Sequence, residues 1–489
     1  MALEWETVIG LEVHAELSTK TKIFCGCRAA FGGEPNTNVC PVCSGMPGAL
    51  PMLNRSVVEY AIRAGLALGC TIARRCKFDR KNYFYPDLPK SYQVSQLYSP
   101  ICRDGQMEVE AGNIKKTVGI REIHMEEDAG KLTHGSAASD KTAGFARGST
   151  SGTFMDFNRS CVPLLEIVSQ PDFRSADEVL AYLEQLRETL LYLGICDCKM
   201  QEGSLRADVN LSVRKPGDEM GVRTEMKNLN SFKAVGRAIE YETERHIEIL
   251  ESGGMVVQET RRWDDEKGES YGMRSKENAP DYRYFPEPDL LPIEIDDPWL
   301  ERIKQNLPEL ARQKRQRYSN DFGISEYEAS VLTGHKKISD LFEDLAAQSG
   351  EPVESAHLIT GIIMQLMNST GTAPDELSID GRKLSVLVSL VLGGKINRSA
   401  YKETAQAVFA DNVEPEAYIA EKGLAMVSDN NAITEAVETV LSLHADAVSD
   451  YRSGKDKVFG FLMGEVMKKL GGTGNPAIAR ETLKELLGK

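Results

Sequence analysis

The sequence predicts an α+β protein, with an antiparallel sheet in its N-terminal part and helices in its C-terminal part. Several early segments alternate polar and apolar residues, the period of a strand with one face on a core and one face open. After "LPIEIDDPW" (291–299) the pattern becomes helical. At 489 residues the chain is too long for one core, so we expect domains at 1–295, 296–410 and 411–489.

Four segments carry the alternation, and each places its polar residues on one strand face. They are "GLEVHAEL" (10–17) with Glu12, His14 and Glu16; "GIREIHMEED" (119–128) with Glu122, His124, Glu126 and Asp128; "RADVNLSVR" (206–214) with Arg206, Asp208 and Asn210; and "VRTEMK" (222–227) with Arg223, Glu225 and Lys227.

These polar faces mix carboxylates with histidine, asparagine and arginine, whereas exposed strand faces are often rich in lysine. Either they face water, as most such faces do, or they converge on a cation. Two carboxylates about 4 Å apart repel by roughly 4 kcal/mol at an effective dielectric near 20, and a divalent cation would relieve that. The same residue types occur where Mg²⁺ holds a phosphate against a protein. The pattern alone leaves both interpretations open.

One helix, over 176–193, is clear from its ends and its apolar stripe. Ser175 is the expected N-cap, Glu178 completes a capping box, and Gly194 ends the helix. The stripe that should face the core consists of Val179, Tyr182, Leu183, Leu186 and Leu190. We expect this helix to be structural.

The sequence predicts a structural Zn²⁺ site at Cys25, Cys27, Cys40 and Cys43, because two short cysteine spacings across a modest loop suit four tetrahedral thiolates. Such a closed site stabilises rather than catalyses, and a binding free energy of about 10 to 16 kcal/mol can hold a loop folded. The other six cysteines are expected to be buried thiols: Cys70, Cys76, Cys102, Cys161, Cys196 and Cys198.

Composition and the motifs not found narrow the function further. A net charge of -15 argues against a broad basic surface for nucleic acid, although a local basic face remains compatible with it. The sequence has neither a membrane-length apolar run nor a signal peptide, so we expect a soluble, cytoplasmic protein without a membrane partner. It has no G-x-x-x-x-G-K-[ST] phosphate loop, and the stretch 134–153 is expected to be a mobile surface loop rather than a phosphate cradle.

Several blocks, in order along the chain, resemble the GatB family, which belongs to the tRNA-dependent amidotransferases. They are "GLEVHAEL", "FDRKNYFYPDLPKSYQVSQ" (78–96), "HMEEDAGK" (124–131), "MDFNRSCVPLLEIV" (155–168), "QEGSLRADVNLSVR" (201–214), "EMKNLNSF" (225–232), "DYRYFPEPDL" (281–290) and "GKDKVFGFLMGEVMKKLGGTGNP" (454–476). Cys161 departs from the family, which usually has glycine after "NRS", and this puts the local backbone conformation in doubt.

The resemblance implies a fold and a reaction. The fold is an antiparallel-sheet catalytic cradle related to glutamine synthetase, followed by a helical domain and a small helical tail. The reaction converts Glu-tRNA(Gln) to Gln-tRNA(Gln), and in many organisms Asp-tRNA(Asn) to Asn-tRNA(Asn). A carboxylate does not accept ammonia, so ATP with Mg²⁺ must first convert it to an acyl phosphate. This is a carbon–nitrogen ligase with glutamine as amido donor.

Carried onto this sequence, the resemblance assigns Glu12, His14, Glu127 and Glu225 as Mg²⁺ ligands and Glu126 to a second, looser metal. Strand alternation, however, puts Glu127 opposite Glu126, so both reach one site only if the strand ends or bulges there. Gly130 makes an ending plausible. Because histidine is an unusual Mg²⁺ ligand, we expect Mn²⁺ to substitute well.

Contacts to ATP or the tRNA acceptor end are expected from Lys81, Arg206 and Asp208. The aromatic stretch "RKNYFYPD" (80–87) either stacks on an exposed 3′ end or anchors a loop to the core. In the tail, Val458, Phe461, Leu462 and Met463 are expected in the core. Lys455, Lys457, Lys468 and Lys469 are candidates for tRNA phosphate contacts, although the helix dipole alone would favour the last two.

The resemblance also implies partners, because the sequence lacks the Ser-Ser-Lys constellation of an amidase. In the family, a GatA-type amidase releases ammonia from glutamine, and a GatC-type small subunit clamps the pair into a heterotrimer. Two rival interpretations remain. A non-catalytic RNA-binding protein with a zinc knuckle predicts no ATP turnover, and a carboxylate–metal hydrolase or nuclease predicts activity without ATP and without a partner.

Overall fold

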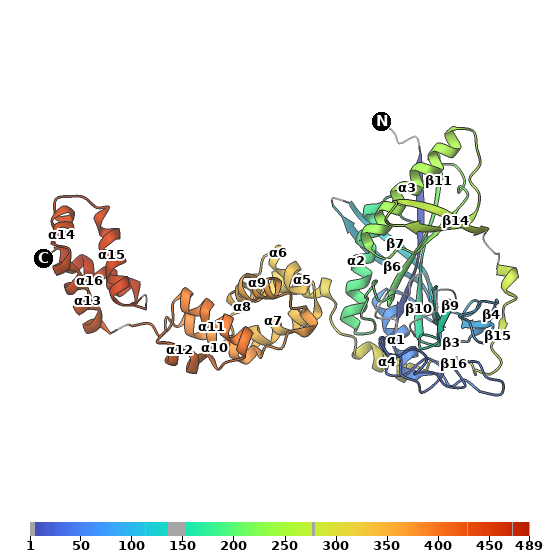
Figure 1. The fold of residues 1–489 in the computed structure, drawn as a ribbon, viewed down its shortest axis with the longest axis horizontal. Coiled ribbons are helices and arrows are strands. Elements are labelled where there is room, and N and C mark those ends of the chain that lie inside the picture. The colour runs from blue at the N-terminus through green and yellow to red at the C-terminus, as the bar shows by residue number, and fades with distance from the viewer. Residues whose placement is uncertain are drawn as a thin grey trace. The chain divides into compact units, whose positions relative to one another are not determined.

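The computed structural model describes residues 5–112, 114–134, 153–275, 279–427, 429–471 and 473–488. The chain divides into two compact units, Met1–Leu310 and Ala311–Lys489. The first contains the sheet and the second is helical (Figure 1). This confirms the predicted combination of a mainly antiparallel sheet with a C-terminal helical region.

The first unit is built on a nine-stranded sheet. In sheet order its strands are β14 (Glu269–Ser275), β13 (Glu259–Asp264), β12 (Thr224–Lys227), β11 (Leu205–Arg214), β1 (Glu6–Glu16), β10 (Pro163–Ser169), β7 (Ile114–Glu127), β6 (Cys102–Ala111) and β2 (Thr71–Ile72). Neighbouring strands run antiparallel, with β12 and β13 as the parallel exception. The four alternating segments of the sequence lie in β1, β7, β11 and β12.

Three helices cover the apolar face of this sheet: α1 (Arg55–Ala67), α2 (Ala176–Leu193) and α3 (Phe232–Glu251). Leu11 and Val13 of β1 are at most 1% exposed and belong to the same buried cluster as Leu186 of α2 and Ala238 of α3. Packing against helices removes the apolar side of the alternation from water. The opposite face of β1 keeps its charged residues.

The helix α2 has the predicted boundaries and the predicted buried stripe. Ser175 accepts a hydrogen bond from the Glu178 backbone N–H, and Gly194 adopts a left-handed conformation with φ 66° at the C-cap. The Glu178 carboxylate does not return to the Ser175 backbone, as in a capping box. It accepts instead from the Arg174 backbone N–H at 2.7 Å and from Lys116 Nζ at 2.8 Å.

Three small sheets and one helix complete the first unit. They are β15 (Phe285–Pro286) with β4 (Asp79–Asn82) and β5 (Tyr92–Ser95), β16 (Ile293–Glu294) with β3 (Arg75–Cys76), β8 (Lys131–His134) with β9 (Thr153–Asp156), and α4 (Asp297–Gln305), besides a 3₁₀ turn at Ala279–Tyr282. Trp299 of α4 donates to Glu59 of α1 at 2.9 Å, so α4 belongs to this unit. Of the stretch 134–153 only the two end residues lie within the described ranges; the predicted loop between them lies outside them.

The second unit consists of helices around two separate apolar clusters. Its elements are α5 (Ala311–Phe322), α6 (Glu326–Thr333), α7 (Lys336–Ser349), α8 (Pro352–Leu358), a π-helical turn (Ile359–Ile363), α9 (Met364–Thr370), a 3₁₀ turn (Pro374–Glu376), α10 (Gly381–Leu392), α11 (Arg398–Asp411), α12 (Pro415–Lys422), α13 (Asn430–Leu443), α14 (Ala445–Arg452), α15 (Val458–Lys469) and α16 (Pro476–Gly488). Every helix in the described ranges is too short or too polar to span a bilayer.

One expected core residue of the tail is not buried. Leu462 is fully buried, whereas Phe461 is 51% exposed and packs edge-on against His444 with ring centroids 5.3 Å apart. Because α15 has only a narrow apolar contact with α13 and α16, neighbouring positions on the helix cannot all face it.

The N-cap of α2 gives a testable prediction. Ser175→Ala should lower the free energy of unfolding of the first unit by about 1 kcal/mol, because the Glu178 N–H loses its acceptor at the helix end. Urea unfolding of the full chain, followed at a probe in the first unit, measures this. Ser175→Asp keeps an acceptor and should retain stability; equal losses in both variants would contradict the capping role.

Candidate functional site

The antiparallel register places charged residues opposite one another across four neighbouring strands. His124 of β7 lies opposite Glu166 of β10, Glu166 lies opposite His14 of β1, and His14 lies opposite Arg206 of β11. Directly opposed residues on one sheet face have Cβ atoms about 4.5 to 5.5 Å apart, so their side chains meet. Two clusters of candidate ligands result.

The first cluster, called here the histidine cluster, consists of His14, Glu126 and Glu166, whose potential ligand atoms all lie within 4.8 Å of one another. His14 Nε2 is 3.5 Å from both Glu126 Oε1 and Glu166 Oε2. His124 Nε2 also contacts Glu166 Oε2, at 2.8 Å. Although burial opposes it, the neighbouring carboxylates raise the pKa of His14 to about 9. Burial and repulsion from Glu166 raise the pKa of Glu126.

The second cluster, called here the acid cluster, consists of Glu12, Asp208 and Glu225, again with ligand atoms within 4.8 Å of one another. Its position follows from the register, in which Glu12 lies opposite Asp208 and Asn210 opposite Glu225. Burial and the charges of Glu166 and Glu225 raise the pKa of Glu12.

Three further side chains orient the acid cluster. Asn210 Nδ2 donates to Glu12 Oε1 at 3.0 Å, and Thr260 Oγ1 donates to Glu225 Oε2 at 3.0 Å. Lys227 pairs with Asp208 and lies 3.1 Å from Glu225 Oε1. Only part of the carboxylate charge is compensated by this one ammonium group.

The residues of the two clusters fit divalent cations. Glu12 and His14 lie two residues apart on one strand face, so the clusters are neighbours. Crowded carboxylates with raised pKa values release repulsion when a cation enters, and oxygen ligands with one histidine suit Mg²⁺ or Mn²⁺. Asn210 Oδ1 is buried without a hydrogen-bond partner in the described part of the chain, as an acceptor for a metal-bound water would be.

Glu127 points away from both clusters. The strand β7 ends at this residue, which is the ending that strand alternation required. Its carboxylate, 1% exposed as a residue, lies 2.6 Å from Lys90 Nζ and accepts from the Val94 backbone N–H at 2.8 Å. Its role as a metal ligand stays a prediction, and its observed partners are cationic and backbone donors.

Cys161, the departure from the family pattern, has a left-handed backbone with φ 65°. Glycine adopts that conformation without steric cost, whereas a cysteine pays about 1 kcal/mol for it. The thiol is buried and donates to Glu127 Oε2 at 2.8 Å. The cysteine therefore adds a contact to Glu127 that glycine cannot make.

The residues expected to contact ATP or the acceptor end occupy different surroundings. Arg206 Nη2 donates to Asp128 Oδ2 at 2.9 Å, and Asp208 pairs with Lys227. Lys81 Nζ lies 4.8 Å from the ring centroid of Tyr282, on the segment that pairs with β4. In the stretch 80–87, Tyr83 packs edge-on against Tyr282, while Phe84 is 86% exposed. The structure thus contains both an anchored and an exposed aromatic residue.

Sequence reasoning missed Glu166 entirely. It is the single acid in the otherwise apolar strand "PLLEIVS", and that isolated charge in a buried strand was the available signal. Asp208 was expected near ATP or the acceptor end, and the structure places it among the candidate metal ligands.

The four predicted zinc ligands come together. The Sγ atoms of Cys25, Cys27, Cys40 and Cys43 lie within 4.8 Å of one another, and the other six cysteines are buried. A hydrogen bond from Cys25 and the nearby Lys22 ammonium lower the pKa of Cys43 to about 4. Four converging sulfurs beside a cation that favours thiolate fit a tetrahedral Zn²⁺ site.

The tail lysines lie around α15. Lys468 and Lys469 occupy its last turn, and Lys457 is its N-cap residue. Lys455 Nζ pairs with Asp450 at 2.9 Å, and Lys468 Nζ lies 3.6 Å from Glu465. These placements keep the side chains near the surface, and their contact with tRNA stays a prediction.

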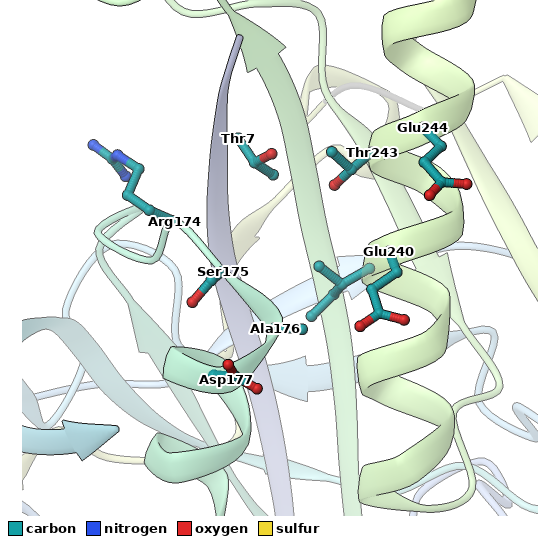
Figure 2. A pocket seen from close by; sticks show the side chains of 9 residues that line it. Thr7, Arg174, Ser175, Ala176, Asp177, Glu240, Thr243 and Glu244 are labelled. Atoms are coloured by element: carbon teal, nitrogen blue, oxygen red, sulfur yellow. The ribbon is translucent and has the colours of Figure 1, made fainter. Parts of the chain in front are cut away.

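A separate hollow of about 340 Å³ lies between β1, the start of α2 and α3 (Figure 2). Asp177, Glu240 and Glu244 line it together with Arg174, which already bonds Glu6 and backbone carbonyls. None of the predicted site residues lines this hollow.

Comparison with known proteins covers nearly the whole chain. A family model described as the GatB/GatE catalytic domain matches residues 7–301, and one described as the GatB domain matches residues 340–487. Proteins named as the second, or B, component of aspartyl/glutamyl-tRNA(Asn/Gln) amidotransferase are similar over their full length. The one from Lachnoclostridium phytofermentans is 54% identical over 99% of both chains, and the one from Caldicellulosiruptor bescii is 52% identical over 100% of both.

Crowding in the acid cluster predicts stabilisation by cations. At free Mg²⁺ or Mn²⁺ ten times the dissociation constant, the free energy of unfolding should rise by about 1.4 kcal/mol, and the melting temperature of the first unit by roughly 2–4 °C. Glu225→Gln should abolish most of that shift. Differential scanning calorimetry with and without the cation measures it, with Glu244→Gln on exposed α3 surface as control. A full shift in Glu225→Gln would exclude the acid cluster.

Proposed function

The chain belongs to the GatB family, and on that premise we propose that it is the transferring subunit of a tRNA-dependent amidotransferase. It converts Glu-tRNA(Gln) to Gln-tRNA(Gln) and, where the host mischarges that tRNA, Asp-tRNA(Asn) to Asn-tRNA(Asn). The observation that carries the proposal is the pair of ligand clusters on the open face of the antiparallel sheet, in a chain whose relatives are named for this reaction.

The reaction needs an activated side chain, because an anionic carboxylate repels a nucleophile and has no good leaving group. In the first step a side-chain oxygen of the esterified glutamate attacks the γ-phosphorus of ATP, and ADP leaves. In the second, ammonia attacks the acyl carbon, phosphate leaves and an amide forms. Both steps depend on positioning and on charge compensation around phosphate oxygens.

The polar sheet face supplies side chains for that compensation. Glu12, His14, Glu225, Glu126 and, as the resemblance has it, Glu127 would hold Mg²⁺; we add Glu166 and Asp208, since they share the two clusters. The cation, when bound, neutralises phosphate charge. Arg206 and Lys81 are the proposed cationic contacts to ATP or the acceptor end, supported by their positions beside Asp128 and the tyrosines.

We further propose that ammonia comes from a GatA-type amidase held by a GatC-type small subunit, in a glutamine-hydrolysing ligase. The family premise supports this, as it supports a glutamine synthetase-like cradle. The division of the second unit into a helical domain, 296–410, and a tail, 411–489, is also a proposal. Its support is the pair of apolar clusters, although Ile419 of α12 still packs with the first.

A structural Zn²⁺ at the four cysteines is proposed from the convergence of their sulfurs and the low pKa of Cys43. Of the rival interpretations, a zinc-knuckle RNA-binding protein leaves the two ligand clusters without a role. A metal-dependent hydrolase would use the clusters equally well, but it would act without ATP and without a partner.

Phosphate release from ATP separates these functions. The chain, assembled with amidase and small subunits, should release phosphate only with glutamylated tRNA(Gln), and Glu126→Gln should reduce that rate at least about a hundredfold. Glu240→Gln, an exposed change on α3, should leave it intact. Release that ignores aminoacylation, or that survives in Glu126→Gln, would refute the proposed kinase step. Glu127→Ala in the same assay tests whether the end of β7 also takes part.

The tail lysines predict a salt-dependent effect on tRNA binding. Lys468→Glu with Lys469→Glu should weaken binding and reduce the slope of log K against log salt by roughly 0.7–0.9 for each lost phosphate contact. Fluorescence anisotropy with labelled tRNA at several salt concentrations measures the slope. Lys115→Glu, a surface change in β7, is the control. An unchanged slope would remove these lysines from the tRNA interface.

A further inference from the structure

The cysteine loop, residues 25–43, is hydrogen-bonded to a second turn at residues 156–161. Asn158 bridges the two: its Oδ1 accepts from the Asn38 backbone N–H at 2.8 Å, and its Nδ2 donates to the Glu34 carbonyl at 2.7 Å. The Phe157 backbone N–H donates to Asn36 Oδ1 at 2.8 Å. Ser160, 2% exposed, donates from Oγ to the Cys43 carbonyl at 3.0 Å.

A fully buried lysine reinforces this junction. Lys22 Nζ donates to the Asn38 carbonyl at 2.8 Å, to the Phe157 carbonyl at 3.3 Å and to Cys43 Sγ at 3.6 Å. A buried ammonium group requires several partners to offset its desolvation. Lys22 obtains them from both the cysteine loop and the second turn, so moving either one would leave the charge unpaired.

The second turn in its turn holds the acidic turn, residues 127–130, at the end of β7. The Cys161 backbone N–H donates to the Asp128 carbonyl at 3.0 Å, and the Asp128 N–H donates to the Val162 carbonyl at 2.8 Å. Arg159 donates to the carbonyls of Ala129 and Gly130 at 3.1 and 2.9 Å. The contact of Cys161 with Glu127 lies at the same junction.

We infer that Lys22, Asn158 and Ser160 are positioning residues, through which order in the cysteine loop fixes the acidic turn and hence Glu126 and Asp128. The inference rests on the proposed function, since it assigns these residues to the same site. None of the three touches either ligand cluster. They act through the backbone of residues 127–130.

A metal at the cysteines matters to this arrangement because the loop has little other structure. Between Cys27 and Cys40 the chain contains neither helix nor strand, and residues 30–37 are mostly exposed. Ligation by four cysteines closes such a loop and removes alternative conformations. Without it, Asn36 and Asn38 lose their fixed positions, and Asn158 loses its partners.

The test uses the full chain with Zn²⁺ supplied during purification. Asn158→Ala combined with Ser160→Ala should retain one zinc per chain by metal analysis. By hydrogen exchange, the amides of 127–130 should exchange about tenfold faster or more, because the local opening equilibrium loses buried hydrogen bonds. Mn²⁺ affinity at the ligand clusters, measured by electron paramagnetic resonance, should fall severalfold. Ser44→Ala is the matched control, since Ser44 bonds only within the cysteine loop, to the Cys40 carbonyl.

Exchange at 127–130 within twofold of wild type, or the same acceleration in Ser44→Ala, would overturn the inference. If the double variant does not fold, a zinc chelator added to the reduced wild-type chain replaces it. Faster exchange should then appear in both 25–43 and 127–130, and a change confined to 25–43 would be contrary to the inference. These outcomes are independent of tRNA-dependent phosphate release, so the inference and the proposed function fail separately.

Discussion

The register that pairs β1 with β10 and β11 is the constraint on which the site depends. Because side chains alternate across a strand, a slip of one residue would send Glu12 and His14 into the core and bring Leu11 and Val13 to the open face. The helices α1, α2 and α3 cover the apolar face and make that slip costly. Burial of apolar side chains therefore holds together carboxylates that repel one another.

The charges at the site are balanced unevenly. In the histidine cluster, His14 and His124 both contact Glu166, so much of the negative charge is compensated within the protein. In the acid cluster, Lys227 faces three carboxylates. A cation entering the histidine cluster must replace existing contacts, whereas one entering the acid cluster relieves repulsion. This difference orders the two positions by expected affinity, with the acid cluster the tighter.

The site is also supported from behind by segments distant in sequence. The strand β5 bonds to the end of β7 through the Val94 N–H and Ser95, and the cysteine loop reaches the same end through residues 156–161. Buried lysines lie at both junctions, Lys90 beside Glu127 and Lys22 beside Cys43. The end of β7 is thus fixed by ion pairs and hydrogen bonds, while the centre of the sheet is fixed by apolar packing.

The sequence by itself determined the features that depend on near neighbours. Alternation identified β1, β7, β11 and β12, capping residues bounded α2, and cysteine spacing identified a loop whose sulfurs converge. Only the tertiary structure decided which faces meet. Glu166 enters the histidine cluster because β10 lies between β1 and β7, and Glu127 leaves for Lys90 because β7 ends there. Strand order and register arise from contacts between residues far apart in the chain, and no local pattern carries that information.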